Sequence, residues 1–183
     1  MVRHLPNLLS TLRLLAAPFA AWLIIAGHDT AALLVFAAAG ASDGLDGFIA
    51  RRWGFTSDFG AWLDPVADKL LMLMSFAALF KVGMTPLWLL VLVVARDLAI
   101  IIAWLLVKLF ALPMQTKALF IGKLSTAIQL LYVLSALLVL ALDLKVPRLE
   151  QAAAWVCGLV TILSAAAYRG VFLRGLFRGR RTA

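Results

Sequence analysis

Six apolar runs follow one another along the chain, each close to the length of about 20 residues that a helix needs to cross a bilayer. They cover approximately Leu8–Ala26, Ala31–Arg51, Phe59–Phe80, Pro86–Phe110, Ala118–Leu142 and Gln151–Phe172, and the breaks between them carry turn residues. Because lipid cannot hydrogen-bond to bare backbone, an open chain crosses it only as helices. The pattern predicts an all-α integral membrane protein, a six-transmembrane-helix bundle that forms one domain over residues 1–183.

Composition supports this class and argues against nucleic-acid binding. Only 14% of residues are charged and the mean hydropathy is +1.03, whereas ordinary globular proteins contain roughly 25% charged residues. The net charge of +8 would suggest nucleic acid in a soluble protein, but no nucleic-acid motif interrupts the apolar runs. Cys157 is the single cysteine, so a disulfide framework is excluded. The first residues, MVRHLPNLLS, resemble neither a transit peptide nor a cleavable signal peptide.

Basic residues between the runs are distributed unevenly. Twelve Lys and Arg residues fall on the side of the two termini, against three on the other side: Lys81, Lys145 and Arg148. Cytoplasmic loops carry the excess of basic residues, so both termini are expected in the cytoplasm, which agrees with an even number of spans. The expected location is a bacterial cytoplasmic (inner) membrane.

Five of the nine carboxylates lie within 26 positions, and four of them recur at helical spacing at the cytoplasmic ends of the second and third runs. The positions around them recur every three or four residues: Asp43, Asp46, Gly47, Ala50 and Arg51 on the second run, and Gly60, Asp64 and Asp68 on the third. In a helix this spacing places each set on one face. Two helices can therefore present four carboxylates to each other at the cytoplasmic boundary.

A carboxylate cluster in a membrane needs positive charge, because one Asp costs about 2.5–3.5 kcal/mol to insert and like charges repel. Arg51, Arg52 and Lys69 could offset it only partly. Hard oxygen donors with no His or Cys nearby favour Mg²⁺ or Mn²⁺. Four carboxylates suffice for two such ions, and an ion pair of this kind suits displacement at phosphorus. An ion transporter would spread its acids through the bilayer depth, and a structural anchor has no use for the cluster.

The eight positions Asp43-x2-Asp46-Gly47-x2-Ala50-Arg51-x8-Gly60-x3-Asp64-x3-Asp68 resemble the signature of the CDP-alcohol phosphatidyltransferases. The resemblance implies that Asp43, Asp46, Asp64 and Asp68 hold two divalent ions, and that Asp68 is also the general base. It implies a CDP-binding pocket made by Asp46, Gly47, Ala50, Arg51 and Gly60. The implied substrate is CDP-diacylglycerol, with release of CMP, and the implied assembly is a homodimer.

The acceptor has to be sought outside this signature. Arg96 in the fourth run and Lys123 near the start of the fifth are cations that look buried. Arg96 could pair with Asp97, but adjacent helix residues point in different directions, and Lys123 could instead reach the lipid headgroups. Family members with phosphorylated acceptors imply the other interpretation, in which Arg96 and Lys123 bind the acceptor phosphate.

Two branches of the family fit, one with phosphatidylglycerol as the acceptor and one with glycerol-3-phosphate. The segments ARDLAIIIAW and LVFAAAGASDGLDGFIAR are more similar to the first, cardiolipin-forming branch. The same is true of the run that contains Lys117, Lys123, Thr126, Ala127 and Gln129. We therefore expect phosphatidylglycerol as the acceptor, with glycerol-3-phosphate as the alternative.

Overall fold

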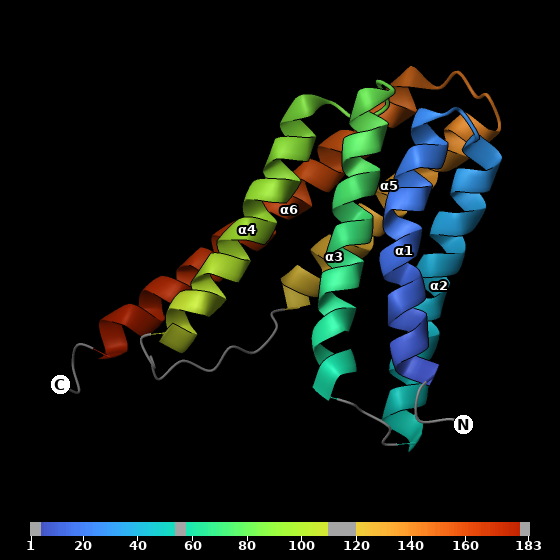
Figure 1. Cartoon of the computed structure of the whole chain (residues 1–183). Helices are drawn as coiled ribbons and strands as arrows, with labels where there is room; N and C mark the ends of the chain where they lie inside the picture. Colours follow the sequence, from blue (N-terminus) through green and yellow to red (C-terminus); the bar gives the residue numbers. More distant parts are fainter. Residues whose placement is uncertain (1–4, 54–57, 110–119, 180–183) are drawn as a thin grey trace. The chain divides into compact units, whose positions relative to one another are not determined.

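The computed structural model describes the backbone of residues 5–53, 58–109 and 120–179. Side chains are described for residues 11–42, 66–109 except 104 and 108, and 120–170. Within these ranges the chain forms helices and no strands (Figure 1): α1 Leu5–Ile25, α2 Asp29–Trp53, α3 Asp58–Lys81, α4 Leu87–Leu109, α5 Phe120–Ala141 and α6 Pro147–Gly179. Each predicted run contains one helix, so the prediction of an all-helical fold is confirmed.

Three helical segments among the described residues are long and apolar enough to cross a membrane: Leu87–Val107, Phe120–Ala141 and Pro147–Gly170. Two shorter apolar segments, Thr11–Ile25 and Asp29–Ser42, lie in α1 and α2. The structure thus supports a multi-pass membrane type. The count of six spans and the cytoplasmic placement of both termini stay predictions.

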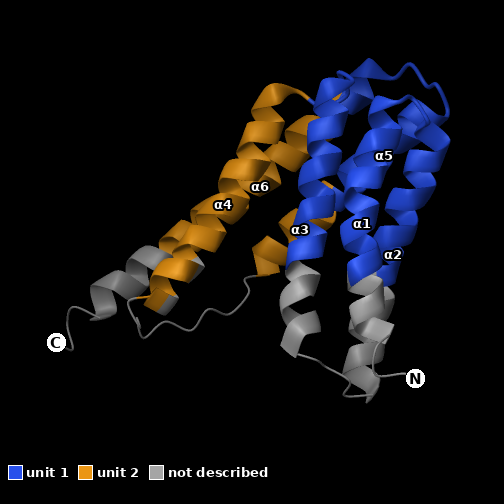
Figure 2. Cartoon of the chain, viewed as in Figure 1, with its two compact units in different colours: residues 1–85, 130–150 blue, residues 86–129, 151–183 orange. Residues whose placement is uncertain are grey.

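The chain divides into two compact units (Figure 2). Unit 1 contains residues 1–85 and 130–150, and unit 2 contains residues 86–129 and 151–183. The division falls inside α5, so the first part of that helix belongs to unit 2 and the rest to unit 1. One domain over residues 1–183 stays a prediction.

Small side chains allow the helices of unit 1 to approach closely. Helix α1 packs against α3 and α2, and its Ala17 and Ala20 are completely buried. On α3, Phe76 stacks on Tyr132 of α5 with ring centroids 5.5 Å apart. The Tyr132 hydroxyl donates a hydrogen bond to Thr85 Oγ1 at 3.2 Å. This pair of contacts holds the end of α3 and the residues after it against α5.

Helices α1, α3 and α5 end in the same hydrogen-bonded turn, with one residue in the left-handed region. That residue is Gly27 at φ 74°, Gly83 at φ 83° and Asp143 at φ 47°. In each case the N–H of this residue donates to the carbonyl three residues earlier, and the N–H of the next residue donates to the carbonyl five residues earlier. An example is the bond from His28 N–H to the Leu23 carbonyl at 2.9 Å. These are Schellman motifs, for which glycine is the usual residue because it lacks Cβ. At two of these three helix ends, the left-handed residue is therefore glycine.

Helix α6 is longer than its apolar run. The sequence predicted Gln151–Phe172, and the helix extends from Pro147 to Gly179. Proline is well suited to the first position of a helix, because its φ is already helical and its missing N–H has no intrahelical partner. The limits of the apolar run therefore indicate the part of α6 suited to lipid, whereas the helix itself continues beyond both limits.

In unit 2, aromatic rings cover a glycine of α6. Trp88 of α4 stacks on Trp155 of α6 with centroids 4.7 Å apart. A Cβ at Gly158 would lie 2.5 Å from Cζ3 of Trp88. Glycine at this position therefore allows the Trp88 ring to lie directly on α6.

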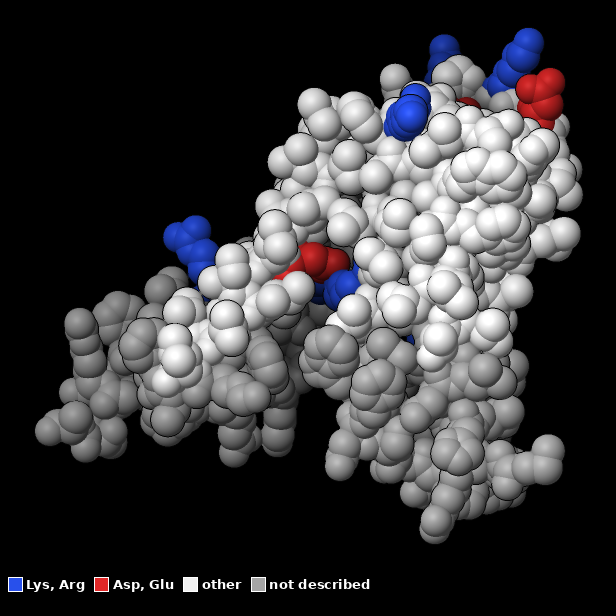
Figure 3. Space-filling view, viewed as in Figure 1, with Lys and Arg blue, Asp and Glu red and all other residues white. Residues whose placement is uncertain are grey.

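The described surface is mainly uncharged in the view of Figure 3, and its visible charges are confined to a few small groups. Large apolar side chains such as Leu15, Leu34 and Trp155 are more than half exposed. In a soluble protein such a surface would aggregate or bind a partner. On membrane-type helices it is the surface that lipid covers.

We expect Gly158→Ala to destabilise the protein and Gly170→Ala not to do so. Both glycines lie in α6, but a Cβ at Gly170 would meet no atom within 4 Å. Displacement of Trp88 by the Gly158→Ala methyl should cost about 1–3 kcal/mol of unfolding free energy, whereas Gly170→Ala should be neutral or stabilising by about 1 kcal/mol. Thermal melting in detergent micelles measures both. Equal melting temperatures for the two variants would contradict the packing described.

Candidate active site

The predicted signature lies on the helices that the sequence indicated. Helix α2 carries positions 43–51 and α3 carries positions 60–68, so the helical backbone places each set of positions on one face. Seven of the side chains lie outside the described residues: Asp43, Asp46, Gly47, Ala50, Arg51, Gly60 and Asp64. Asp68 is described, and it is half-buried on α3.

Among the described residues, no group of three or more His, Cys, Asp or Glu side chains could hold a metal ion. Three of the four predicted ligands lie outside those residues. The donor set still fits the predicted ions, because it consists of carboxylates at same-face positions of two helices, which are the hard oxygen donors that Mg²⁺ and Mn²⁺ accept.

Arg13 on α1 is a residue whose role the sequence leaves open. Orientation and an approach to the nucleotide explain its position about equally well, and its exposed fraction is 1%. Helix α1 packs against α2 and α3, the two helices that bear the signature. A buried guanidinium is costly unless it is paired and hydrogen-bonded. The available signal for this burial was its position five residues inside an apolar run.

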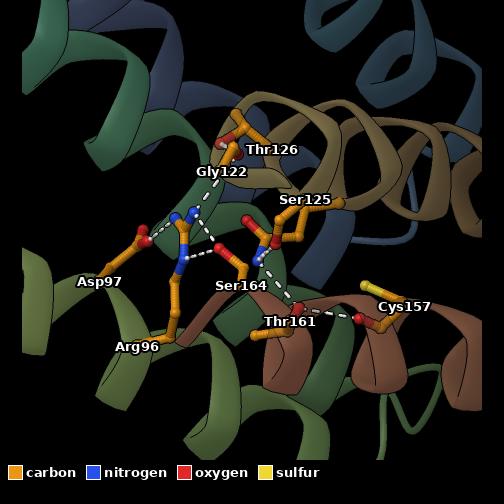
Figure 4. Close-up of polar contacts among 9 residues, drawn as sticks. Arg96, Asp97, Gly122, Ser125, Thr126, Cys157, Thr161 and Ser164 are labelled. Carbon is orange, nitrogen blue, oxygen red and sulfur yellow. Dashed lines mark hydrogen bonds and ion pairs between the residues drawn. The ribbon is translucent and has the colours of Figure 1, made fainter. Parts of the chain in front are cut away.

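Arg96 lies at the centre of a buried polar cluster in unit 2 (Figure 4). Its Nε and Nη2 both donate to Ser164 Oγ on α6, at 3.3 Å and 2.9 Å. Nη2 also donates to the Gly122 carbonyl on α5 at 3.3 Å, and the Tyr168 ring lies 5.9 Å from the guanidinium carbon. Arg96 is 5% exposed, so its predicted burial is confirmed.

The expectation that Arg96 and Asp97 point in different directions is wrong. Arg96 Nη1 lies 2.7 Å from Asp97 Oδ1, and their side chains are 4% and 17% exposed. The backbone vectors of adjacent residues do diverge, but the long arginine side chain can bend back to its neighbour. Desolvation favours this contact, because a buried guanidinium needs a counter-charge.

The expectation that Lys123 is buried is also wrong, because its side chain is exposed. The neighbouring Gly122 is buried, and a Cβ there would collide with the Tyr168 side chain. Glycine therefore allows the backbone of α5 to meet α6, with its carbonyl directed at Arg96. Sequence reasoning missed Gly122, Ser164 and Tyr168, since they lie 26 to 72 residues from Arg96.

A second hydrogen-bonded group lies beside the first in Figure 4. Gln129 Nε2 of α5 donates to Thr161 Oγ1 of α6 at 3.2 Å, and the Thr161 hydroxyl donates to the Cys157 carbonyl at 2.8 Å. Gln129 and Thr161 are both at most 1% exposed. These two buried side chains thus have partners on their own or a neighbouring helix, as an apolar surrounding favours.

Taken together, the apolar helices and the two acid-bearing helix faces define a multi-pass membrane protein with a candidate metal-dependent site. Residues 3–163 match the family described as CDP-alcohol phosphatidyltransferase. The chain belongs to the CDP-alcohol phosphatidyltransferase family, which confirms the resemblance carried by the eight-position signature.

Relatives named for two different products are similar to the chain. "Cardiolipin synthase (CMP-forming)" of Homo sapiens is 37% identical over 73% of the chain and 50% of its own length. The protein of the same name in Streptomyces coelicolor is 33% identical over 88% of the chain and 72% of its length. "Probable phosphatidylglycerophosphate synthase" of Mycobacterium tuberculosis is 32% identical over 100% of the chain and 88% of its length. The chain spans between 35% and 50% of the length of the animal relatives that it matches.

We expect Arg96 and Asp97 to be energetically coupled. Arg96→Met should lower the unfolding free energy by about 3 kcal/mol, because it removes a buried cation that pairs with a largely buried carboxylate and bonds to two further helices. Adding Asp97→Asn should recover part of that loss, with a coupling energy of at least about 1 kcal/mol. The measurement is a double-mutant cycle followed by thermal melting in detergent.

The matched control for this cycle is Lys81→Met, which removes an exposed cation at the end of α3. It should change the unfolding free energy by no more than about 0.5 kcal/mol. Strictly additive losses in the Arg96 and Asp97 cycle would show that the ion pair contributes nothing.

Proposed function

We propose that the protein is a CDP-diacylglycerol-dependent phosphatidyltransferase that forms cardiolipin and CMP from CDP-diacylglycerol and phosphatidylglycerol. The observation that carries the proposal is the family match over residues 3–163, within which all eight signature positions are present. The human and Streptomyces relatives named for this reaction support the choice of acceptor. The alternative is transfer to glycerol-3-phosphate, which the full-length similarity to the Mycobacterium protein favours.

In this proposal the carboxylates of Asp43, Asp46, Asp64 and Asp68 hold two divalent ions, Mg²⁺ or Mn²⁺. When bound, such ions stabilise charge on the attacking and leaving oxygens of a displacement at phosphorus. Asp46 also belongs to the CDP pocket with Gly47, Ala50, Arg51 and Gly60, whose small residues admit the nucleotide while Arg51 binds the pyrophosphate.

Asp68 has a second role in this proposal, as the general base. It takes the proton of the acceptor hydroxyl as that oxygen bonds to the lipid-side phosphorus. The bond between this phosphorus and the bridging oxygen breaks, and CMP leaves with that oxygen. The half-buried position of Asp68 on α3 supports this role, since a base must be shielded but reachable.

Arg96 and Lys123 would bind the phosphate of the acceptor. A guanidinium has five N–H donors, and hydrogen bonds among the described residues use four of those of Arg96. One Nη1 donor remains for a ligand, and Asp97 offsets part of the charge. Lys123, whose side chain is exposed, would supply the further donors and positive charge that the phosphate needs.

The proposed setting is a bacterial inner membrane that the chain crosses six times, with both termini and the active site on the cytoplasmic side. The excess of basic residues on that side supports this orientation. The proposed assembly is a homodimer, which rests on family resemblance.

Activity should require divalent metal and the signature carboxylates. CMP release from CDP-diacylglycerol should stop in excess chelator and return on addition of Mg²⁺ or Mn²⁺. Asp68→Asn should lower kcat by about 10²–10⁴-fold through loss of the general base, and Asp64→Asn should abolish turnover. Asp143→Asn is the matched control, because Asp143 is exposed at a left-handed position that asparagine adopts readily. Full activity in excess chelator would exclude the two-metal mechanism.

An acceptor test decides between the two reactions. Purified protein in detergent receives CDP-diacylglycerol with either phosphatidylglycerol or glycerol-3-phosphate, and lipid products are separated by chromatography and mass. We expect cardiolipin from the first mixture and no phosphatidylglycerophosphate from the second. The reverse result would establish the alternative. If neither acceptor supports CMP release, both reactions are contradicted.

A further inference from the structure

Ser164 accepts more of the hydrogen bonds from Arg96 than any other described group. Its Oγ accepts two of the four hydrogen bonds that Arg96 donates, from Nε at 3.3 Å and from Nη2 at 2.9 Å. Ser164 is completely buried, so water does not compete for these bonds. The residue lies on α6, 68 positions from Arg96, outside the acid-bearing helices and beyond the end of the family match at residue 163.

Two bonds to one oxygen restrict a guanidinium more than two bonds to separate flexible groups. Nε and Nη2 form one edge of the planar group, and an oxygen that accepts from both fixes the direction of that edge. Asp97 holds Nη1 from the opposite side at 2.7 Å. The plane of the guanidinium and the direction of its remaining Nη1 N–H are therefore set before any ligand binds (Figure 4).

The third attachment depends on a close approach of α5 to α6. Gly122 gives its carbonyl to Nη2 at 3.3 Å, and a Cβ at this position would collide with the Tyr168 side chain. The face of that ring also lies 5.9 Å from the guanidinium carbon, within the range of a cation–π contact. Three helices of unit 2 thus converge on one cation, and contacts among the described residues leave it a single donor.

We propose that Ser164 is a positioning residue for the acceptor phosphate, acting through Arg96. The inference rests on the proposed function, in which Arg96 binds that phosphate. A long arginine side chain loses considerable rotamer freedom when it binds a ligand. Ser164 removes this freedom in the unliganded protein and directs the remaining Nη1 donor. Less side-chain conformational entropy is therefore lost when the acceptor binds. A serine that only stabilised the fold would leave the KM for the acceptor unchanged.

The test compares KM values for the two substrates in the full-length protein in mixed micelles, with whichever acceptor the wild type uses. Ser164→Ala should raise the acceptor KM about tenfold, the effect of losing a hydrogen bond to a charged group. The KM for CDP-diacylglycerol should stay within about twofold of the wild-type value. Ser164→Thr keeps the hydroxyl and should restore most of the acceptor affinity.

Thr161→Val is the matched control. Thr161 lies one turn earlier on α6, is equally buried and accepts a hydrogen bond from Gln129 rather than Arg96. Its loss should lower the melting temperature about as much as Ser164→Ala and leave both KM values unchanged. If Ser164→Ala does not fold, the nearly isosteric Ser164→Cys, with its weaker acceptor, should give an intermediate rise in acceptor KM.

An unchanged acceptor KM in a folded Ser164→Ala or Ser164→Cys variant would overturn the inference. So would an equal rise in both KM values, or the same shift in Thr161→Val. Failure of the proposed function looks different, because the wild type would then release no CMP with either acceptor.

Discussion

Lipid offers no hydrogen bonds, and this constraint organises the whole chain. Backbone groups are satisfied inside helices, and a buried polar side chain is stabilised when it has a partner on a neighbouring helix or on its own helix. Arg96, Gln129 and Thr161 have such partners in unit 2, each through a described hydrogen bond. Polar residues in such a protein are expensive to keep. Each one that persists therefore indicates either a contact that holds helices together or a contact with a ligand.

The same constraint explains why the helices could be predicted from the sequence. Apolar runs near bilayer length leave helix as the only solution, and α1, α3 and α4 end within three residues of their predicted limits. The largest discrepancy is α6, where Pro147 begins the helix earlier and the basic tail continues it to Gly179. Neither feature changes hydropathy in a way that marks a helix end. Turn residues were more informative, since Gly27 and Gly83 adopt the left-handed conformation that ends a helix.

For the candidate site, what could be predicted depended on sequence separation. The four signature acids of α2 and α3 recur at helical spacing within 26 positions, so the sequence pattern alone is enough to place them on two helix faces. Ser164 and Gly122 contact Arg96 from other helices, and nothing local in their neighbourhoods distinguishes them. Lys123 shows a different difficulty: a basic residue near the start of a helix has the same sequence signal whether its side chain is buried or exposed, and this one is exposed.

Acceptor choice follows a different logic from phosphatidyl transfer. The family includes relatives named for two different products, at 32–37% identity to this chain. Residues that would hold CDP and metal would meet the shared donor, so in the proposal they cannot distinguish one acceptor from another. Both acceptors also carry a phosphate, so a cation alone does not discriminate between them either. In the proposed site, any discrimination would have to come from the direction and effective charge of the guanidinium that meets this phosphate. Asp97, Ser164 and the Gly122 carbonyl hold that guanidinium, so the proposal places specificity in what surrounds the cation rather than in its presence.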